Sequence, residues 1–375
     1  MDGMALCLSP LAPYLLAAGV CSMKQKHSIF ILLTVSILLT QWGCKKKDNI
    51  IAESSGLPPF EEISAFDQNV LLGRGVNFGN ALEAPNEGDW GMTIQADYFT
   101  LISEAGFQSI RIPISWGYHA LSEPPSTIDS DFFKRIDWVI QSTINADLIA
   151  VVNCHHIAEL DADPEGKKEW FVEIWRQIAT RYKDYPNSVV FEIKNEPHDQ
   201  FDADNWDEVY KAVLAVIRET NPTRNVIIGP ISYNAFGAMG TLTLPENDSH
   251  IIATFHYYNP FQFTHQGASW VDGSEDWLGT TWGDKQSHRR QIELDLGSVA
   301  SWAEEENRPV YMGEFGAYEA ADMDCRVLWT DYVARKAEEL GFSWAYWEFG
   351  AGFGIYDRDA GEWREELLEA LIPEE

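Results

Sequence analysis

Two glutamates follow apolar runs and have the side-chain chemistry for proton transfer or nucleophilic attack. Glu196 lies in the string Asn195-Glu196-Pro197, and Glu314 follows the run 310–313. A carboxyl group at the end of a buried strand loses solvation, which favours its neutral form, whereas a nearby cation such as Arg111 favours the ionised form. A pair with one protonated and one ionised carboxyl group can break a glycosidic bond. The alternative is that one glutamate only forms a salt bridge with Arg111.

Eight short runs rich in β-branched residues alternate with amphipathic segments. They predict strand–helix repeats over residues 60–375, a single domain without an internal stretch rich in Pro, Gly or Ser. Eight regular repeats favour a (β/α)8 TIM barrel over a doubly wound sheet. The candidate strands are 72–77, 109–113, 148–153, 189–194, 225–229, 251–256, 309–313 and 343–347. The candidate helices include 132–145, 170–182, 206–219 and 328–340.

In such a barrel the chemistry lies at the C-terminal ends of the strands. Strands four and seven face each other across the barrel mouth, so we expect Glu196 and Glu314 to lie close together. The fifth strand is an exception, because its end at Gly229-Pro230 offers little beyond Tyr233. The polar and aromatic residues at the other ends are Asn77, Asn80, Arg111, His155, His156, Asn195, Glu196, His256, Tyr258, Glu314, Trp347 and Glu348.

The composition excludes some partners. Against 58 Asp and Glu there are 27 Lys and Arg, so the net charge is −31. Such a field repels nucleic acid and anionic lipid, and neutral or cationic partners remain. The chain is rich in aromatic residues, with 15 Trp, 14 Tyr and 19 Phe. These rings either pack in a hydrophobic core or lie exposed in a groove, where they could stack on sugars.

The N-terminal region predicts export. Residues 1–44 have the basic start and short apolar run of a secretory signal, and 45–59 form a polar linker. Gly43-Cys44 resembles a bacterial lipobox, so we expect a lipid anchor on Cys44 and a cell-surface or periplasmic lipoprotein, or a secreted protein. An ordinary cleaved signal or an uncleaved anchor is the alternative. Translation could start at Met1 or at Met23.

No metal or cofactor is expected. The chain has no CxxC, HExxH or P-loop pattern, and the half EF-hand at 161–166 has Val172 where the last calcium ligand would stand. Neighbouring strand residues point to opposite faces, so at most one of His155 and His156 aims into the barrel unless the strand has already ended. Cys154 and Cys325 are expected to be free, buried thiols.

Seven strings recur in order from about residue 60 to 372: Gly75 to Glu83, Arg111-Ile112-Pro113, His155-His156, Asn195-Glu196-Pro197, His256 to Pro260, Gly313-Glu314-Phe315-Gly316 and Trp344-Ala345-Tyr346-Trp347. They resemble those of glycoside hydrolase family 5. Through Ala84 to Trp90 and Phe261 to Gly267, the chain is most similar to bacterial endoglucanases with mixed glucan and mannan activity. The resemblance implies a retaining endo-β-1,4-glycanase that acts on a β-linked polysaccharide or oligosaccharide, and we expect the protein to be a monomer.

The resemblance implies roles for the matching residues. Glu196 would be the general acid/base and Glu314 the nucleophile, held ionised by Arg111 and Tyr258. Of the others, Asn195 would contact the sugar 2-hydroxyl, His256 would position the acid/base, Trp347 would form the floor at the cleavage point, and Asn80, Glu83, His155, His156, His265 and Trp270 would line more distal subsites. The alternatives stay open for Glu348, a subsite ligand or a solvated neighbour, and for Trp90, Trp116, Trp277 and Trp282, stacking platforms or loop anchors.

Three other functions are compatible with parts of this pattern. A β-mannanase or glucomannanase would use the same site, since it differs only in the 2-hydroxyl that it accepts. A non-catalytic glycan-binding lipoprotein would share the signal and the aromatic residues but would not need both carboxylates. A metal-dependent barrel hydrolase would need Asp ligands beside the strand-end histidines, and the sequence lacks them.

Overall fold

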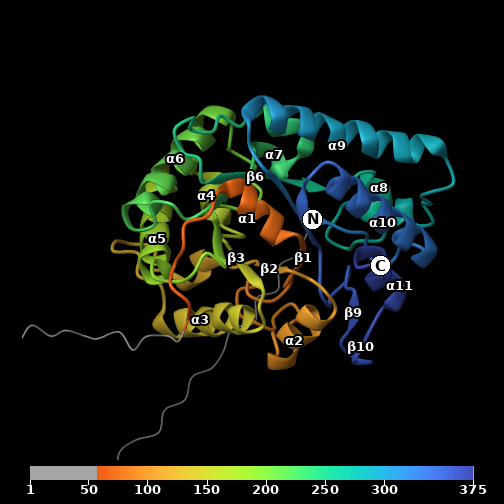
Figure 1. Cartoon of the computed structure of the whole chain (residues 1–375), viewed down its shortest axis with the longest axis horizontal. Coiled ribbons are helices and arrows are strands. Elements are labelled where there is room, and N and C mark those ends of the chain that lie inside the picture. The colour runs from red at the N-terminus through yellow and green to blue at the C-terminus, as the bar shows by residue number, and fades with distance from the viewer. Residues whose placement is uncertain (1–56, 375) are drawn as a thin grey trace, which may run out of the picture. The chain divides into compact units, whose positions relative to one another are not determined.

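The computed structural model describes residues 57–374. The leader expected at 1–44, its Cys44 and nearly all of the linker at 45–59 lie outside these residues. Within them, eight parallel strands pair in sequence order and the eighth pairs with the first, which closes a barrel (Figure 1). The predicted (β/α)8 barrel is therefore confirmed. The strands are β1 Arg74–Asn77, β2 Ser109–Ile112, β3 Ile149–Asn153, β4 Val189–Glu192, β5 Val226–Ile228, β6 Ile251–Tyr257, β7 Val310–Phe315 and β8 Ser343–Tyr346.

Each predicted strand recurs within two residues at either end. The helices differ more, because they begin up to six residues before the amphipathic pattern. Polar caps cause the difference: Asp129 accepts from two amides at the start of α3, and Asp163 caps α5, whose first residue is Pro164. The helices are α1 Ala65–Leu72, α2 Ala96–Glu104, α3 Ser130–Asn145, α4 Ala158–Ala162, α5 Pro164–Tyr182, α6 Ala203–Thr220, α7 Ile231–Asn234, α8 Phe261–Thr264, α9 Gln286–Glu306, α10 Met323–Glu339 and α11 Glu365–Leu371.

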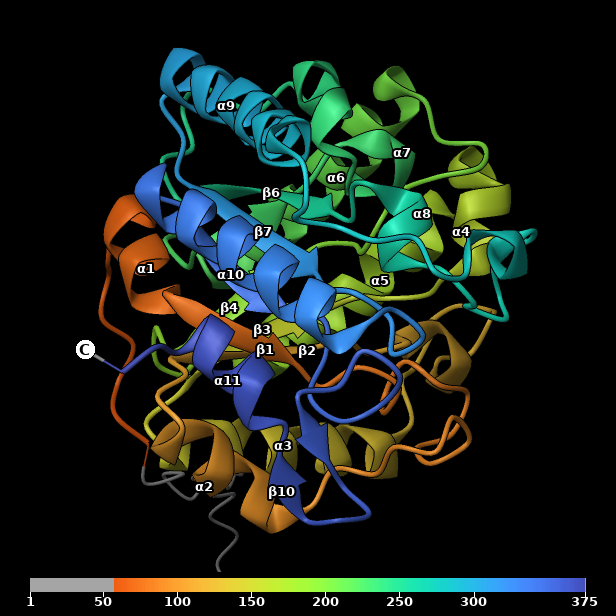
Figure 2. The ribbon, with the colours of Figure 1, turned by 90° about the vertical axis from the view of Figure 1, so that its right-hand side faces the viewer.

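The hydrophobic core has two parts. A small cluster inside the barrel contains Val151, Val190, Ile252 and Tyr311, and α1 adds Leu72 to it from the N-terminal end of the strands. A larger cluster lies between the strands and the helices around them, where α10 and α11 pack side by side (Figure 2). Because apolar residues fill the barrel interior and one end, polar side chains collect at the C-terminal end.

The aromatic excess belongs mainly to packing. The fully buried tryptophans are Trp116, Trp175, Trp206, Trp282, Trp329 and Trp344. Trp90 and Trp270, by contrast, are 44% and 60% exposed. Between residues 57 and 374, no helix has the length and apolar character needed to cross a membrane.

Candidate active site

A cleft of about 710 Å³ opens at the C-terminal ends of the strands. It brings together ten of the fourteen residues predicted for the site. These ten are Asn80, His155, His156, Asn195, Glu196, Tyr258, His265, Trp270, Glu314 and Trp347. The loops also contribute lining residues for which no role was predicted, namely Tyr318, Glu319 and 351–353.

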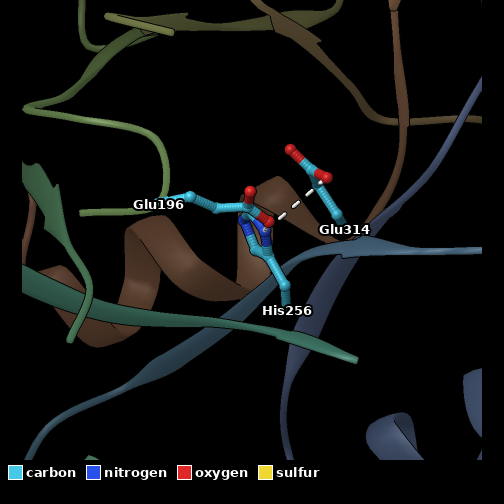
Figure 3. A group of neighbouring side chains, drawn as sticks. All are labelled: Glu196, His256 and Glu314. Atoms are coloured by element: carbon cyan, nitrogen blue, oxygen red, sulfur yellow. Dashed lines mark hydrogen bonds and ion pairs between the residues drawn. The ribbon is translucent and has the colours of Figure 1, made fainter. Parts of the chain in front are cut away.

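Glu196 and Glu314 lie beside each other with His256 between them (Figure 3). His256 Nδ1 is 2.6 Å from Glu196 Oε1 and 3.6 Å from Glu314 Oε2. One oxygen of each carboxyl group and one ring nitrogen of His256 all lie within 4.8 Å of one another. Glu196 follows β4 and Glu314 lies in β7, so strands four and seven carry the pair as predicted. This spacing lets both carboxyl groups act on one bond.

Arg111, in β2, is fully buried and holds Glu314 in place. Its Nη1 donates to Glu314 Oε1 at 2.6 Å and to the side-chain oxygen of Asn77 at 2.9 Å. Its Nη2 donates to the side-chain oxygen of Asn195 at 2.7 Å. The other oxygen of Glu314 accepts from the Tyr258 hydroxyl at 3.0 Å. Both oxygens of Glu314 therefore have a donor.

Glu192 is a site residue that sequence reasoning missed. It is fully buried, and its two carboxylate oxygens accept from Nε and Nη2 of Arg111 at 2.7 and 2.8 Å. A signal for it was present, because Glu192 stands two residues after Val190 and so points into the barrel with it. A charge at such a position needs a partner.

Burial and neighbouring charges separate the roles that the two carboxyl groups can play. Burial raises the pKa of Glu196 to about 7, so this group can hold a proton near neutral pH. Burial also raises the pKa of Glu314, but His256 and Arg111 oppose that effect. Burial lowers the pKa of His256 to about 4, so its ring is neutral at pH 7.

Aromatic rings form the walls around the carboxyl pair. Trp347 is half-buried and stacks on His155, with ring centroids 5.7 Å apart and planes inclined by 10°. Exposed His156 contacts the ring of Trp90 at 5.8 Å. On the other side His265 stacks on Phe261 at 4.0 Å. Flat apolar faces of this kind suit the C–H faces of sugar rings.

Of the tryptophans left open, Trp90 lines the cleft, whereas two others are anchors. Trp116 is buried and its Nε1 donates to the Asn153 carbonyl at 3.1 Å. Trp282 is also buried. Trp277 is half-buried beside Phe261 at 5.9 Å and lies outside the cleft lining.

Glu83, predicted as a subsite ligand, and Glu348, considered as one, both turn toward the amides of their own loops. Glu83 is buried and accepts from the amides of Asn80 and Ala81, the latter at 2.9 Å. Glu348 is buried and accepts from the amides of Gly350 and Ala351, each at 2.8 Å, and of Phe353 at 3.1 Å. Both turn back onto their own loops because unpaired backbone amides there need acceptors. Glu348 is therefore not a solvated neighbour, and subsite contact by Glu83 or Glu348 stays a prediction.

The fifth strand contributes more than predicted. The turn after β5 places buried Asn234 with its Nδ2 at 3.5 Å from His256 Nε2. Tyr233, the residue noted from the sequence, is 54% exposed and stacks on His198 at 4.4 Å. The strand end therefore supports His256 through a residue that sequence reasoning passed over.

Glu196, His256 and Glu314 also have the donor atoms for a metal ion. Their arrangement fits a hydrogen-bonded triad better, because Glu314 already accepts from Arg111 and Tyr258 and a cation would lie beside the guanidinium.

Elsewhere, Cys154 and Cys325 are free, as predicted, although Cys325 is only half-buried. Asp161 of the half EF-hand forms an ion pair with Lys194.

Comparisons with known proteins agree on one family. The family model described as "Cellulase (glycosyl hydrolase family 5)" matches residues 72–352. Endoglucanase H of Acetivibrio thermocellus is 35% identical over 317 residues, 83% of this chain and 34% of the relative. Endoglucanase B of Clostridium cellulovorans is 28% identical, covering 80% of this chain and 73% of the relative. The chain thus spans about a third of the length of the first of these curated relatives.

Solved structures give a fuller overlap. Thermotoga maritima Cel5A in complex with cellobiose superposes with a TM-score of 0.81 at 47% identity, covering 82% of this chain and 100% of the other. The same protein in complex with mannotriose gives the same TM-score, identity and coverage.

Proposed function

Because the chain belongs to glycosyl hydrolase family 5, we propose that it is a retaining endo-β-1,4-glycanase that hydrolyses β-glucan polysaccharides. The observation that carries the proposal is the carboxyl pair, Glu196 and Glu314, with oxygens within 4.8 Å of each other. Retaining enzymes have carboxyl groups about 5–5.5 Å apart, whereas inverting enzymes need roughly 6.5–9.5 Å to fit a water molecule. The separation here supports retention.

The proposed reaction has two steps. Ionised Glu314 attacks the anomeric carbon while protonated Glu196 donates its proton to the leaving oxygen, which breaks the glycosidic bond and forms a glycosyl-enzyme ester. Water then attacks the same carbon and Glu196 takes its proton, so Glu314 is released and the configuration is retained. The pKa of about 7 at Glu196 supports both of its roles.

Neighbouring side chains would assist without exchanging protons with the sugar. Arg111 keeps a positive charge beside Glu314, which favours the ionised nucleophile and the leaving carboxylate. Arg111 also holds the oxygen of the Asn195 amide, so the amide nitrogen is free to point at a sugar 2-hydroxyl. The face of Trp347 would carry the sugar whose bond is cleaved.

The decisive experiment replaces the nucleophile. Glu314→Gln is expected to lower kcat on mixed-linkage β-glucan by at least about 10³-fold with substrate binding retained, because no covalent intermediate can form. Glu173→Gln, which changes an exposed carboxylate of α5 outside the cleft lining, is the matched control and should keep activity. Wild-type rates from Glu314→Gln would contradict the assignment of Glu314 as the nucleophile. A first product with inverted configuration, detected by proton NMR, would contradict the retaining mechanism.

A second activity, on mannan or glucomannan, is supported by one specific observation: the similar Thermotoga maritima protein has been solved with mannotriose as well as with cellobiose. Glucose and mannose differ in the orientation of the 2-hydroxyl, which one or two hydrogen bonds recognise. Rates on carboxymethylcellulose, mixed-linkage glucan, glucomannan and mannan, measured in parallel, are expected to be highest on a glucan. A higher rate on mannan than on every glucan would reassign the enzyme as a mannanase.

Export and a lipid anchor at Cys44 belong to the same proposal. They are supported by the basic start, the apolar run and the Gly43-Cys44 junction in the sequence. Radiolabelled palmitate should enter the wild-type protein in a bacterial host and not the Cys44→Ser variant. Equal labelling of both proteins would contradict the proposed lipid anchor.

We also propose that the protein is a monomer. The molar mass measured by light scattering of the purified protein tests this.

A further inference from the structure

A buried ion pair lies directly behind the acid/base, outside the cleft lining. Lys194 Nζ is 3.0 Å from Asp161 Oδ1, and the two side chains are 1% and 2% exposed. Lys194 follows β4 and Asp161 belongs to α4, so the pair joins two elements that are 33 residues apart in sequence. Burying two charges is costly unless both are well paired. The pair therefore needs further contacts that compensate for its burial.

The ion pair contacts the backbone that carries the acid/base. Lys194 Nζ donates to the carbonyl of Asn195 at 3.0 Å, and His198 Nδ1 is 2.6 Å from the carbonyl of Glu196. The same nitrogen of His198 lies 3.7 Å from Asp161 Oδ1. The two peptide carbonyls that flank Glu196 are thus both held by side chains facing Asp161.

The conformation of Glu196 explains why such support is needed. Its φ is +44°, in the left-handed region that residues with a Cβ seldom adopt. Residues in this region persist only where the surroundings fix them, and they cluster at functional sites. Unsupported, the chain would relax here, and the Glu196 carboxyl group would move from His256 and from the bond it protonates.

We propose that Lys194, Asp161 and His198 form a backbone clamp, named here for its hold on the two carbonyls, that positions the carboxyl group of Glu196 for proton transfer. The clamp rests on the proposed function, because it acts through the acid/base of that reaction. Its members are positioning residues, since none of them reaches the reacting atoms.

The clamp also adds charge near Glu196. The charged and titratable groups that face Glu196 come from β2, β4, β6, β7 and the segment after β4. They are Arg111, Glu192, His256, Glu314, Lys194 and His198, together with Tyr258 after β6 and Tyr233 in α7. Lys194 is one of the cations that oppose the effect of burial on the pKa of Glu196. Removing it should therefore shift the alkaline limb of the kcat/KM profile to higher pH.

The test uses substrates that differ in their need for a proton. Lys194→Met should lower kcat/KM on mixed-linkage glucan about 10–100-fold, because a carboxyl group displaced by about 1 Å transfers protons poorly. On 2,4-dinitrophenyl β-cellobioside, whose leaving group departs without a proton, the loss should stay within about threefold. His198→Asn removes a more exposed member of the clamp and should show the same selectivity if Lys194→Met does not fold.

Arg218→Met is the matched control. Arg218 is also paired with an aspartate, Asp248 at 2.7 Å, and also holds backbone carbonyls, but at the opposite end of the barrel. Arg218→Met should lower thermal stability. Its kcat/KM should change by the same factor on mixed-linkage glucan and on 2,4-dinitrophenyl β-cellobioside. Equal losses on both substrates for the clamp variants, or no loss, would overturn the proposal. An inactive wild-type protein would instead refute the proposed function and leave no reaction for the clamp to serve.

Discussion

At the residue scale, one guanidinium organises the centre of the site. Arg111 has five N–H groups, and it makes five hydrogen bonds, to Glu192, Glu314, Asn77 and Asn195. Burial alone would lower the pKa of Arg111, but the carboxylates of Glu192 and Glu314 reverse that and raise it well above its ordinary value. The cation is therefore permanent, and each of its partners is fixed in direction.

Glu192→Gln tests how much the buried ion pair between Glu192 and Arg111 contributes to the stability of the protein. The substitution keeps the shape but removes one of the two carboxylates that balance Arg111. Breaking a buried pair leaves charge uncompensated, so the free energy of unfolding should fall by about 3 kcal/mol or more. Urea unfolding followed by circular dichroism measures it. Glu173→Gln, which breaks an exposed pair with Arg176, should cost at most about 1 kcal/mol. Similar losses in both variants would contradict the argument.

The pH profile should follow Glu196. The acid must be protonated to act, and burial raises its pKa to about 7, so kcat/KM on glucan should fall as the pH rises through about 7. His256 cannot be the group responsible, because its pKa lies near 4. On 2,4-dinitrophenyl β-cellobioside, whose leaving group needs no proton, the wild-type kcat/KM should lack this alkaline limb. The same limb on that substrate would assign the titration to another group.

At the scale of elements, the loop after β8 is shaped by one carboxylate. Glu348 accepts from three amides of residues 350–353, and three of these residues line the cleft. Burial raises the pKa of Glu348 to about 7, while the loop amides lower it again in part. The conformation of this loop therefore depends on the hydrogen bonds from its amides to the two carboxylate oxygens of Glu348.

Glu348→Gln tests this loop. An amide offers one acceptor oxygen in place of two, and bonds to charged groups contribute about 1.5–3 kcal/mol, so the variant should lose about that much stability. Because the loop lines the cleft but holds no reacting group, KM should rise more than kcat falls. Steady-state kinetics on cello-oligosaccharides measures both constants, with Glu173→Gln, outside the cleft lining, as the control. A fall in kcat at unchanged KM would place Glu348 in the chemistry instead.

Elements were more predictable from the sequence than the directions of side chains. The strands could be predicted because both of their faces are buried, which leaves continuous apolar runs. The direction of a carboxylate after a strand depends on the path of the loop, so the bonds of Glu83 and Glu348 to their own loop amides could not be predicted. Glu192 and Arg111 are 81 residues apart, and only the closed barrel brings them together. The pairing of Lys194 with Asp161 could not be predicted for the same reason.

At the scale of the whole molecule, the net charge of −31 should affect charged and neutral substrates differently. A neutral glucan neither gains nor loses from the field of the protein. Carboxymethylcellulose carries carboxylates on the same β-1,4-glucan backbone, so the field repels it and lowers its encounter rate. Salt screens this repulsion, because the Debye length falls from about 30 Å at 0.01 M to about 10 Å at 0.1 M.

Raising NaCl from 0.01 to 0.1 M should therefore increase kcat/KM on carboxymethylcellulose severalfold and leave the value on mixed-linkage glucan within about 20%. Initial rates at low substrate concentration, measured on both polymers in one salt series, give the ratio directly. Sodium and potassium salts should behave alike, because screening depends on ionic strength and not on the cation. If both substrates respond equally, salt acts on the enzyme itself, and the acidic surface has a role in stability rather than in substrate encounter.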